Sequence, residues 1–187
     1  MKKTKSIKNS TAALAAAKRI LKTAANIYID KPLKYAPIID GKQYLCDGFR
    51  LAELTEHLPL PSIPKDKISH YPDMQKIIKK SHDMVVLKLP TKTKLKAFIK
   101  ISKANKINND SQYTGVIYDF GFNYPQVNAS YLLDMMELLP NMTAYCVPCK
   151  DKSGVNLNSI YLENHNSRGL LLPVRPNEKI PRAKTEL

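Results

Sequence analysis

The sequence predicts an α+β protein made of repeated units, in each of which a helix precedes antiparallel strands. Three stretches carry apolar residues at the spacing of one helix face, and short β-branched or alternating runs follow each of them. A content of 43% hydrophobic residues over 187 positions suffices for one sizeable core or two small ones. Because a helix of about three turns is unstable alone in water, each helix should bury its apolar face on the strands that follow. We therefore expect the helices to lie on one side of the sheets.

The first predicted helix covers Thr11–Ala25. Ser10 or Thr11 can cap its start, because a short polar side chain accepts a backbone amide of the first turn. Its apolar stripe consists of Leu14, Ala17, Leu21 and Ala24. Another face carries three cations, Lys18, Arg19 and Lys22. This helix should pack closely on one side and present its cations on another.

The strands after this helix are predicted from turn residues. Asp40-Gly41 readily adopts the positive φ of a two-residue turn, which indicates a hairpin over Ile38–Cys46. A further strand is expected over Phe49–Leu54, after a second Asp-Gly pair. The proline-rich segment Leu58–Pro64 excludes helix and indicates an extended connector.

The next unit is expected to contain a strand at Met84–Leu89, a helix at Thr91–Lys106 and a strand at Tyr113–Phe122. Four lysines recur along one side of this helix at i, i+4, i+8 and i+11: Lys92, Lys96, Lys100 and Lys103. Such a stripe repels itself unless it is solvated or faces an anion.

A third helix is predicted over Val127–Leu139, where four apolar residues fall at i, i+3, i+4 and i+7. Asn128 or Ser130 can cap its start, and Pro140 disfavours helical geometry at the residue before it. Three strands are expected to follow: Met142–Val147, Leu157–Glu163 and Gly169–Val174.

The net charge of +14 is concentrated in two places. The first 22 residues hold seven cations with no acid before Asp30, and residues 88–106 hold seven lysines with no acid between Asp83 and Asp110. Nucleic acid is the partner that this distribution suggests, and a merely solvated, solubilising face is the alternative.

Three cysteines without a regular framework favour a reducing compartment. Cys146 and Cys149 form a CxxC, which alone supplies two of the ligands that a structural zinc needs, so we expect no metal and no cofactor. The apolar runs are far shorter than a membrane span, and Lys18-Arg19 interrupts the alanine-rich stretch that a signal peptide would need. The protein is therefore expected in the cytoplasm, with no membrane partner.

No catalytic motif stands out. The four histidines are scattered, and the sequence contains no GxSxG motif, no phosphate-binding loop and no obvious carboxylate pair. We therefore expect that the protein has no catalytic residues and is not an enzyme. A nucleic-acid-modifying enzyme whose site assembles only in space remains an alternative.

Four motifs resemble those of one family, in the family's order. Cys46–Leu54 (CDGFRLAEL) resembles the TDGHRLA signature of bacterial DNA polymerase III β sliding clamps, and Tyr71–Ile78 (YPDMQKII) resembles their FPDY segment. Val127–Leu139 resembles the second helix of their last domain, and Gly169–Pro176 (GLLLPVRP) resembles their terminal strand. The resemblance implies a DNA-clamp fold, in which helices line a positively charged channel and sheets form the outer surface.

The resemblance also implies a pocket for peptides of DNA polymerases or clamp loaders. Carried over by motif, it would comprise Gly48, Phe49, Arg50, Leu51, Pro72, Ile77, Leu170, Leu172, Pro173, Val174 and Arg175. Double-stranded DNA would bind to the cations of the first two helices: Lys18, Arg19, Lys22, Lys92, Lys96, Lys100 and Lys103.

The chain departs from the family in length and in several residues. It has room for a basic arm with a reduced clamp-like domain at 1–66, a clamp-like domain at 67–176 and a flexible tail at 177–187. Phe49 replaces the motif's histidine, and the third helix carries Asp134 and Glu137 rather than lysines. A shortened chain of this kind resembles a phage- or mobile-element-type relative.

We therefore expect a sliding-clamp-like processivity factor that binds DNA and offers a pocket to replication proteins. The alternative is a truncated relative that acts as an adaptor or decoy without encircling DNA. Three candidate helices stand where a complete two-domain unit would have four, so a ring would need another stoichiometry. We expect a monomer or weak oligomer alone and a DNA-dependent homo-oligomer on duplex DNA.

Overall fold

The computed structural model describes residues 10–28, 32–104, 115–149 and 155–175. The α-helices are α1 (Thr11–Ile27), α2 (Met74–Ile77), α3 (Lys92–Ala104) and α4 (Ala129–Leu138), and two 3-10 helices are η2 (Pro32–Lys34) and η3 (Lys65–His70). The strands are β1 (Ile38–Ile39), β2 (Lys42–Cys46), β3 (Arg50–Leu54), β4 (Val85–Leu87), β5 (Ile117–Asp119), β6 (Gln126–Asn128), β7 (Thr143–Cys146), β8 (Ile160–Glu163) and β9 (Ser167–Leu171).

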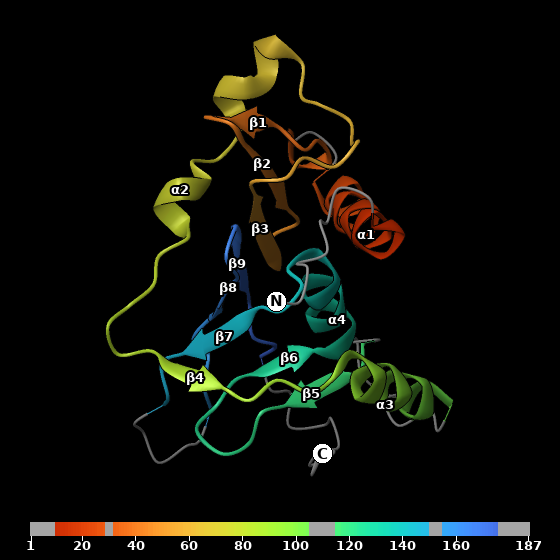
Figure 1. Cartoon of the computed structure of the whole chain (residues 1–187), viewed down its shortest axis with the longest axis vertical. Helices are drawn as coiled ribbons and strands as arrows, with labels where there is room; N and C mark the ends of the chain where they lie inside the picture. Colours follow the sequence, from red (N-terminus) through yellow and green to blue (C-terminus); the bar gives the residue numbers. More distant parts are fainter. Residues whose placement is uncertain (1–9, 29–31, 105–114, 150–154, 176–187) are drawn as a thin grey trace, which may run out of the picture.

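Seven of the strands form one antiparallel sheet in the order β1-β2-β3-β9-β8-β7-β4, and β5 pairs with β6 separately (Figure 1). The centre of the large sheet is the pair β3 and β9, in the register Leu51↔Leu170. This pair joins the segments predicted as 1–66 and 67–176 in one sheet. The boundary between those segments falls within η3, and the division into two domains stays a prediction.

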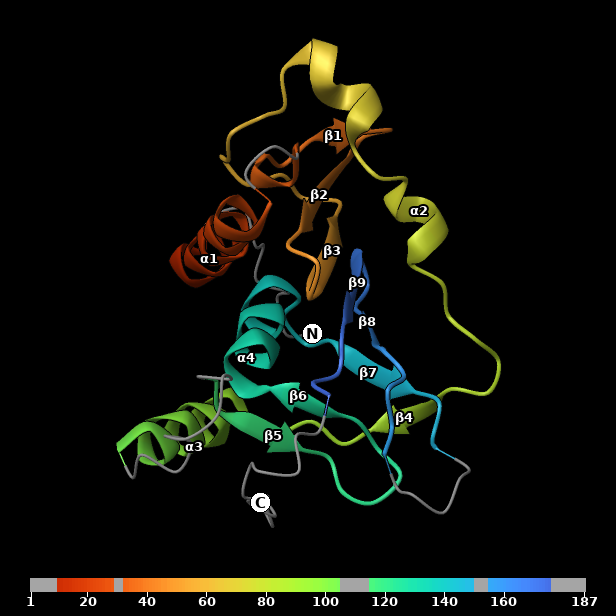
Figure 2. The same ribbon diagram turned by 180° about the vertical axis from the view of Figure 1, so that it is seen from behind.

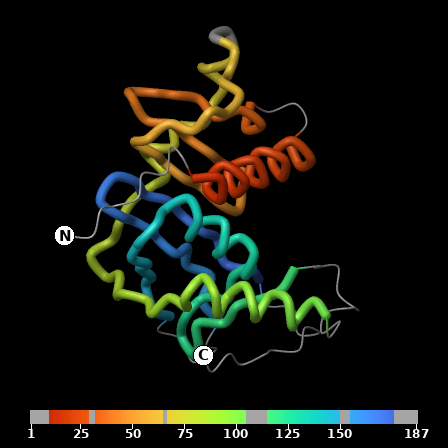
Figure 3. Tube along the Cα trace, turned by 45° about the vertical axis from the view of Figure 1, so that its right-hand side comes forward, coloured from red at the N-terminus to blue at the C-terminus, as the bar shows by residue number. Residues whose placement is uncertain are grey.

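The three long helices lie on one side of this sheet, with α4 between α1 and α3 (Figures 1 and 3). A core of apolar side chains separates helices and sheet, and it includes Ile20 of α1, Leu95 of α3 and Leu132 of α4. The predicted α+β architecture, with helices on one side of the sheets, is therefore confirmed. No helix in the described part of the chain combines the length and apolarity that crossing a membrane would require.

Gly169 on β9 sets how closely α4 approaches the sheet. A Cβ at this position would lie 2.5 Å from the Leu51 carbonyl oxygen and 2.6 Å from Cε of Met135. The missing side chain therefore makes room for Met135, which is fully buried on α4. A glycine in a strand often marks such a close approach.

A second apolar cluster covers the opposite face of the sheet, where α2 lies on the far side from α1 (Figure 2). One row of this face runs across four strands as Leu51, Leu170, Tyr161 and Tyr145. The segment around α2 covers this row with Tyr71, Met74 and Ile78, all of which are buried.

Helix α1 begins where it was predicted to begin, at Thr11. The Ser10 side chain accepts a hydrogen bond from the Ala13 amide at 3.2 Å, and the helix runs from Thr11 to Ile27. The buried face includes Ala13, Ala16 and Ile20 in addition to most of the predicted stripe, whereas Leu14 is only partly buried.

The third helix begins later than predicted, because Val127 belongs to strand β6. Asn128 caps α4 by accepting the amides of Ser130 and Tyr131 at 2.9 and 3.2 Å. Asn128 is thus the cap, and Ser130 lies inside the helix.

The last strand also differs from its prediction, since β9 covers Ser167–Leu171 rather than Gly169–Val174. Asn164 sets the earlier start by accepting the amides of Asn166 and Ser167 at 3.0 and 2.8 Å. Val174 leaves the sheet and donates its amide to Gln126 of β6 at 2.7 Å. The strand expected at Tyr113–Phe122 is the shorter β5, and its first two residues lie outside the described ranges, as do the arm 1–9 and the tail 177–187.

Candidate nucleic-acid and peptide-binding surfaces

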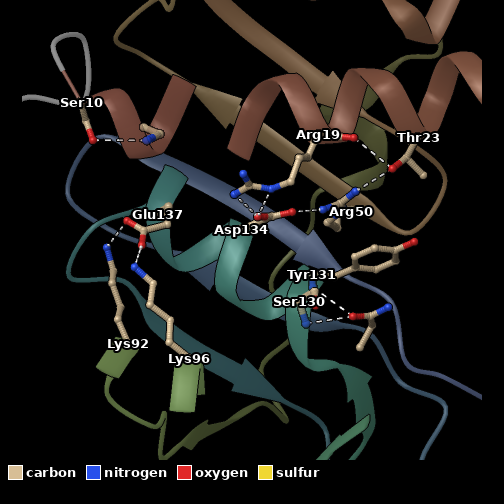
Figure 4. Close-up of polar contacts among 12 residues, drawn as sticks. Ser10, Arg19, Thr23, Arg50, Lys92, Lys96, Ser130, Tyr131, Asp134 and Glu137 are labelled. Atoms are coloured by element: carbon tan, nitrogen blue, oxygen red, sulfur yellow. Dashed lines mark hydrogen bonds and ion pairs between the residues drawn. The ribbon is translucent and has the colours of Figure 1, made fainter. Parts of the chain in front are cut away.

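The helix layer (α1, α4 and α3) carries all seven cations predicted to bind DNA. Carboxylates of the central helix α4 pair with three of them, and Figure 4 shows these contacts. Asp134 accepts Nε and Nη2 of Arg19 on α1, at 2.9 and 2.6 Å. The two acids that the sequence places on the third helix are therefore counter-ions for its neighbours.

Glu137 is the counterpart of Asp134 on the side of α3. Its Oε2 accepts Lys92 Nζ at 3.0 Å, and its Oε1 lies 3.1 Å from Lys96 Nζ. Burial raises the pKa of the Glu137 carboxyl, but the hydrogen bonds from Lys92 and Lys96 outweigh burial and lower its pKa overall. The lysine stripe of α3 thus faces an anion along half of its length.

The other four predicted cations extend into solvent. Lys18, Lys22, Lys100 and Lys103 are exposed, and none of them makes a salt bridge with another described residue. They leave two sets of free positive charge, one on α1 and one in the second half of α3.

Arg50, predicted to line the peptide pocket, is instead almost fully buried behind α4. Its Nε and Nη2 donate to Oδ2 of Asp47 at 2.9 and 2.5 Å, and its Nη1 donates to Asp134. The guanidinium carbon lies 3.9 Å from the ring centroid of Tyr131, and Nη2 is 3.3 Å from Oγ1 of Thr23. This arginine joins α1, β3 and α4. A charge that is buried needs hydrogen-bonding partners, and Asp47, Asp134 and Thr23 supply them for Arg50.

The turn before β3 supports this arginine. Oδ1 of Asp47 accepts the amides of Phe49 and Arg50 at 3.0 and 2.7 Å. Gly48 between them has a φ of +83°, and a Cβ there would lie 2.3 Å from the Tyr28 hydroxyl. The positive φ favours glycine at this position, and a side chain there would also displace the Tyr28 hydroxyl.

The pairing of β3 with β9 brings several predicted pocket residues side by side. Leu172 donates its amide to the Phe49 carbonyl at 2.9 Å, and both side chains are substantially exposed, at 42% and 40%. Along the same two chain segments, two positions away from each, Leu51 and Leu170 are buried in the cluster that includes Tyr71.

The remaining predicted pocket residues occupy two places. Ile77 is 51% exposed on α2, close in sequence to the exposed Pro72. Pro173 and Val174 are partly buried where the chain turns toward β6, followed by the exposed Arg175. The two adjacent, exposed apolar residues Phe49 and Leu172 are named here the apolar surface.

Four residues of these surfaces were not predicted as such: Asp47, Tyr131, Asp134 and Glu137. The i, i+3 spacing of Asp134 and Glu137 is the signal that could identify the last two, because it places both carboxylates on one side of a helix. The partners of Asp47 and Tyr131 depend on tertiary structure.

The described residues contain no group of three or more His, Cys, Asp or Glu side chains that could hold a metal ion. All three cysteines are free thiols, and burial raises the pKa of Cys146 to about 11. A thiol with such a pKa is a poor nucleophile at neutral pH.

No family of known sequences matches the chain, and no curated protein matches it. Solved structures do match. The β subunit from DNA polymerase of Streptococcus pyogenes is 13% identical, with a TM-score of 0.50 over 88% of this chain and 64% of that one. The Helicobacter pylori β clamp, solved bound to a DNA ligase peptide, is 15% identical, with a TM-score of 0.51 over 90% of this chain and 64% of that one.

The chain has the sliding-clamp fold. A third clamp, DNA polymerase III subunit β from Borrelia burgdorferi, is 12% identical, with a TM-score of 0.50 over 95% of this chain and 67% of that one. The sliding-clamp fold that the four motifs imply is thereby confirmed. The chain spans less than two thirds of the length of the S. pyogenes and H. pylori clamps.

Proposed function

We propose that the protein is a non-enzymatic, sliding-clamp-like processivity factor that binds double-stranded DNA and presents a surface to peptides of replication proteins. The observation that carries this proposal is the sliding-clamp fold combined with exposed cations on the helix layer. In this proposal the helix layer faces DNA, and the sheet carries the peptide site at its centre.

Four of the predicted cations, namely Lys18, Lys22, Lys100 and Lys103, are exposed and make no salt bridge with a described residue, and these are the ones proposed to bind phosphates. Each phosphate that a cation neutralises releases a counter-ion, so about four contacts give a slope of roughly −3 to −4 in a plot of log K against log[salt]. The binding should depend little on DNA sequence, because phosphates carry no sequence information.

The DNA proposal is tested with a short duplex in fluorescence anisotropy at several salt concentrations. The variant Lys100→Gln/Lys103→Gln should lose affinity and bring the slope closer to zero by about 2. The control Lys76→Gln/Lys79→Gln removes two exposed lysines near α2 and should change affinity little. Equal losses in the two variants would overturn the assignment of DNA to the helix layer.

The peptide site is proposed at the apolar surface. The H. pylori clamp was solved bound to a DNA ligase peptide, which supports a peptide site in a chain of the same fold. Phe49 and Leu172 are adjacent and exposed here, with the buried Leu51 and Leu170 two positions away along the same chain segments. A short peptide with two or three apolar anchors would cover this surface, and its affinity should tolerate salt far better than that for DNA.

The peptide site is tested by titrating the DNA ligase peptide bound to the H. pylori clamp into this protein. Leu172→Asp places a charge among the apolar anchors and should lower affinity at least about tenfold, because burying an unpaired charge is costly. Leu157→Asp is the control, since Leu157 is also exposed but lies outside the apolar surface. Unchanged affinity in folded Leu172→Asp would show that the peptide does not bind at Leu172.

A second function is favoured by the ion pairs of α4. Because Asp134 and Glu137 already pair with three of the seven predicted cations, DNA binding could be weak enough that the protein acts as an adaptor or decoy for replication proteins. Peptide binding without measurable DNA binding at moderate salt would favour this alternative.

A further inference from the structure

We propose that Glu137 competes with DNA phosphates for Lys92 and Lys96. By binding these two lysines, it limits the number of DNA phosphates that α3 contacts. This inference rests on the proposed DNA binding of the helix layer. It concerns how strongly that layer binds and which lysines take part.

The geometry of Glu137 suits this role, because each of its two oxygens takes one lysine. Oε2 lies 3.0 Å from Lys92 Nζ, and Oε1 lies 3.1 Å from Lys96 Nζ. The Glu137 side chain is only 11% exposed, whereas those of Lys92 and Lys96 are 36% and 59% exposed. A fixed carboxylate thus holds two ammonium groups that solvent, or a phosphate, can still reach.

Spacing along the helix explains why only two lysines are held. Lys92 and Lys96 are one turn apart and converge on the same carboxylate of the neighbouring helix, as Figure 4 shows. Lys100 and Lys103 lie further along α3 and make no salt bridge with a described residue. The lysine stripe is therefore divided into a paired half and a free half.

Phosphate and carboxylate oxygens both accept charge-assisted hydrogen bonds from an ammonium group, so DNA and Glu137 compete for the same donors. Because the lysine ends of these pairs are partly exposed, each pair is weak enough for a phosphate to replace, so Glu137 lowers phosphate affinity without abolishing it.

Asp134 differs from Glu137 in this respect. It pairs with Arg19 but also holds the buried Arg50, so its removal would leave a buried charge without its partner. Among the described residues, the cationic partners of Glu137 are the partly exposed Lys92 and Lys96, so it can be changed without this penalty.

The test compares Glu137→Gln with a matched control, Glu163→Gln, in duplex-DNA binding by fluorescence anisotropy. Both variants remove one negative charge from a carboxylate that binds lysine: Glu137 pairs with Lys92 and Lys96, and Glu163, on strand β8 of the sheet, pairs with Lys80 at 2.6 Å. Glu137→Gln should raise affinity about tenfold or more at 0.1 M salt and steepen the salt slope by about 2, as expected for two added phosphate contacts. Glu163→Gln should change both quantities little.

A second pair of variants assigns the gain to the released lysines. Lys92→Gln/Lys96→Gln should have a small effect in the wild-type background and should remove the gain in the Glu137→Gln background. Equal gains from Glu137→Gln and Glu163→Gln, or wild-type affinity in Glu137→Gln, would overturn the inference alone. Absence of DNA binding in every variant would overturn the proposed function, and the inference with it.

Discussion

Asp134 is the residue on which the helix layer depends most. One carboxylate binds the exposed Arg19 through Oδ1 and the buried Arg50 through Oδ2, and Arg50 in turn binds Asp47. Two acids and two arginines thus balance in charge across α1, α4 and the turn before β3. Arg19 is therefore expected to stabilise the fold more than it contributes to DNA affinity.

We expect Asp134→Asn to destabilise the protein by about 3 to 5 kcal/mol, because Arg50 then remains buried with one of its two carboxylates missing. Urea unfolding followed by circular dichroism measures the loss. Glu137→Gln, which removes pairs with partly exposed lysines only, should cost about 1 kcal/mol or less. Similar losses in the two variants would contradict the special role assigned to Asp134.

The environment of Glu53 leads us to expect that the stability of the protein depends on pH. It accepts Nε and Nη2 of Arg168, both at 2.9 Å, Lys42 at 2.7 Å and the Tyr44 hydroxyl at 3.1 Å. Burial raises the pKa of Glu53, but the hydrogen bonds from Arg168 and Lys42 outweigh it and lower the pKa. The native protein therefore binds this proton less tightly than the unfolded chain, whose glutamates titrate near pH ~4.3.

The contribution of Glu53 to the free energy of unfolding is therefore complete above the pKa of the unfolded chain. It is lost as the pH falls through the lower pKa that Glu53 has in the native protein. The hydrogen bond to Glu53 raises the pKa of Arg168 still further, so Glu53 is the member of this pair that changes its charge in this window. We expect the free energy of unfolding to fall between about pH 5 and pH 3, and the fall to be smaller in Glu53→Gln. Denaturant titrations at several pH values check both expectations, and an equally steep fall in Glu53→Gln would contradict them.

At the scale of elements, α4 is held against the sheet by shape as well as by charge. We expect Gly169→Ala to destabilise the protein by roughly 1 to 3 kcal/mol, because its Cβ would collide with the Leu51 carbonyl oxygen. Met135 Cε, the other close atom, ends a flexible side chain and can move aside, but Leu51 belongs to the paired strand β3. Thermal unfolding measures the effect, and an unchanged melting temperature would show that the sheet adjusts freely.

The longer elements were predictable from periodicity and local capping. The start of α1 follows from Ser10, and the position of the lysine stripe on α3 follows from its spacing. The three-residue strand β6 escaped prediction because Val127 also fits the helical pattern that begins two residues later. The shift of β9 depends on the Asn164 side chain, whose role in the preceding turn has no periodic signal.

The candidate sites were predictable only in part. Motif resemblance predicted that Phe49 and Leu172 belong to one site, and the pairing of β3 with β9 brings them together, while their binding of a peptide stays a prediction. It could not show that Arg50 is buried, because its partners Asp47 and Asp134 lie 3 and 84 positions away in the sequence. Charge counting likewise identified the cations but not their pairing, which depends on the position of α4 between α1 and α3.

At the scale of the whole molecule, the exposed cations predict how assembly depends on DNA. Copies arranged with their helix layers facing one axis would repel one another through Lys18, Lys22, Lys100 and Lys103, and duplex DNA would neutralise that repulsion. We expect a monomer or weak oligomer at low salt and larger species when a duplex is added. Light scattering with and without the duplex measures this. A tight oligomer without DNA at low salt would contradict the electrostatic argument, and a monomer in both conditions would favour the adaptor function.

During synthesis, β3 leaves the ribosome long before the strand that completes its hydrogen bonding. Glu53 on β3 and Arg168 on β9 are 115 positions apart, which corresponds to a delay of roughly 6 to 20 seconds at ordinary translation rates. For that interval one edge of β3 has no partner, and the nascent chain exposes a row of free backbone groups together with Leu51. Strand β3 is thus open to wrong partners until almost the last described residue has been made.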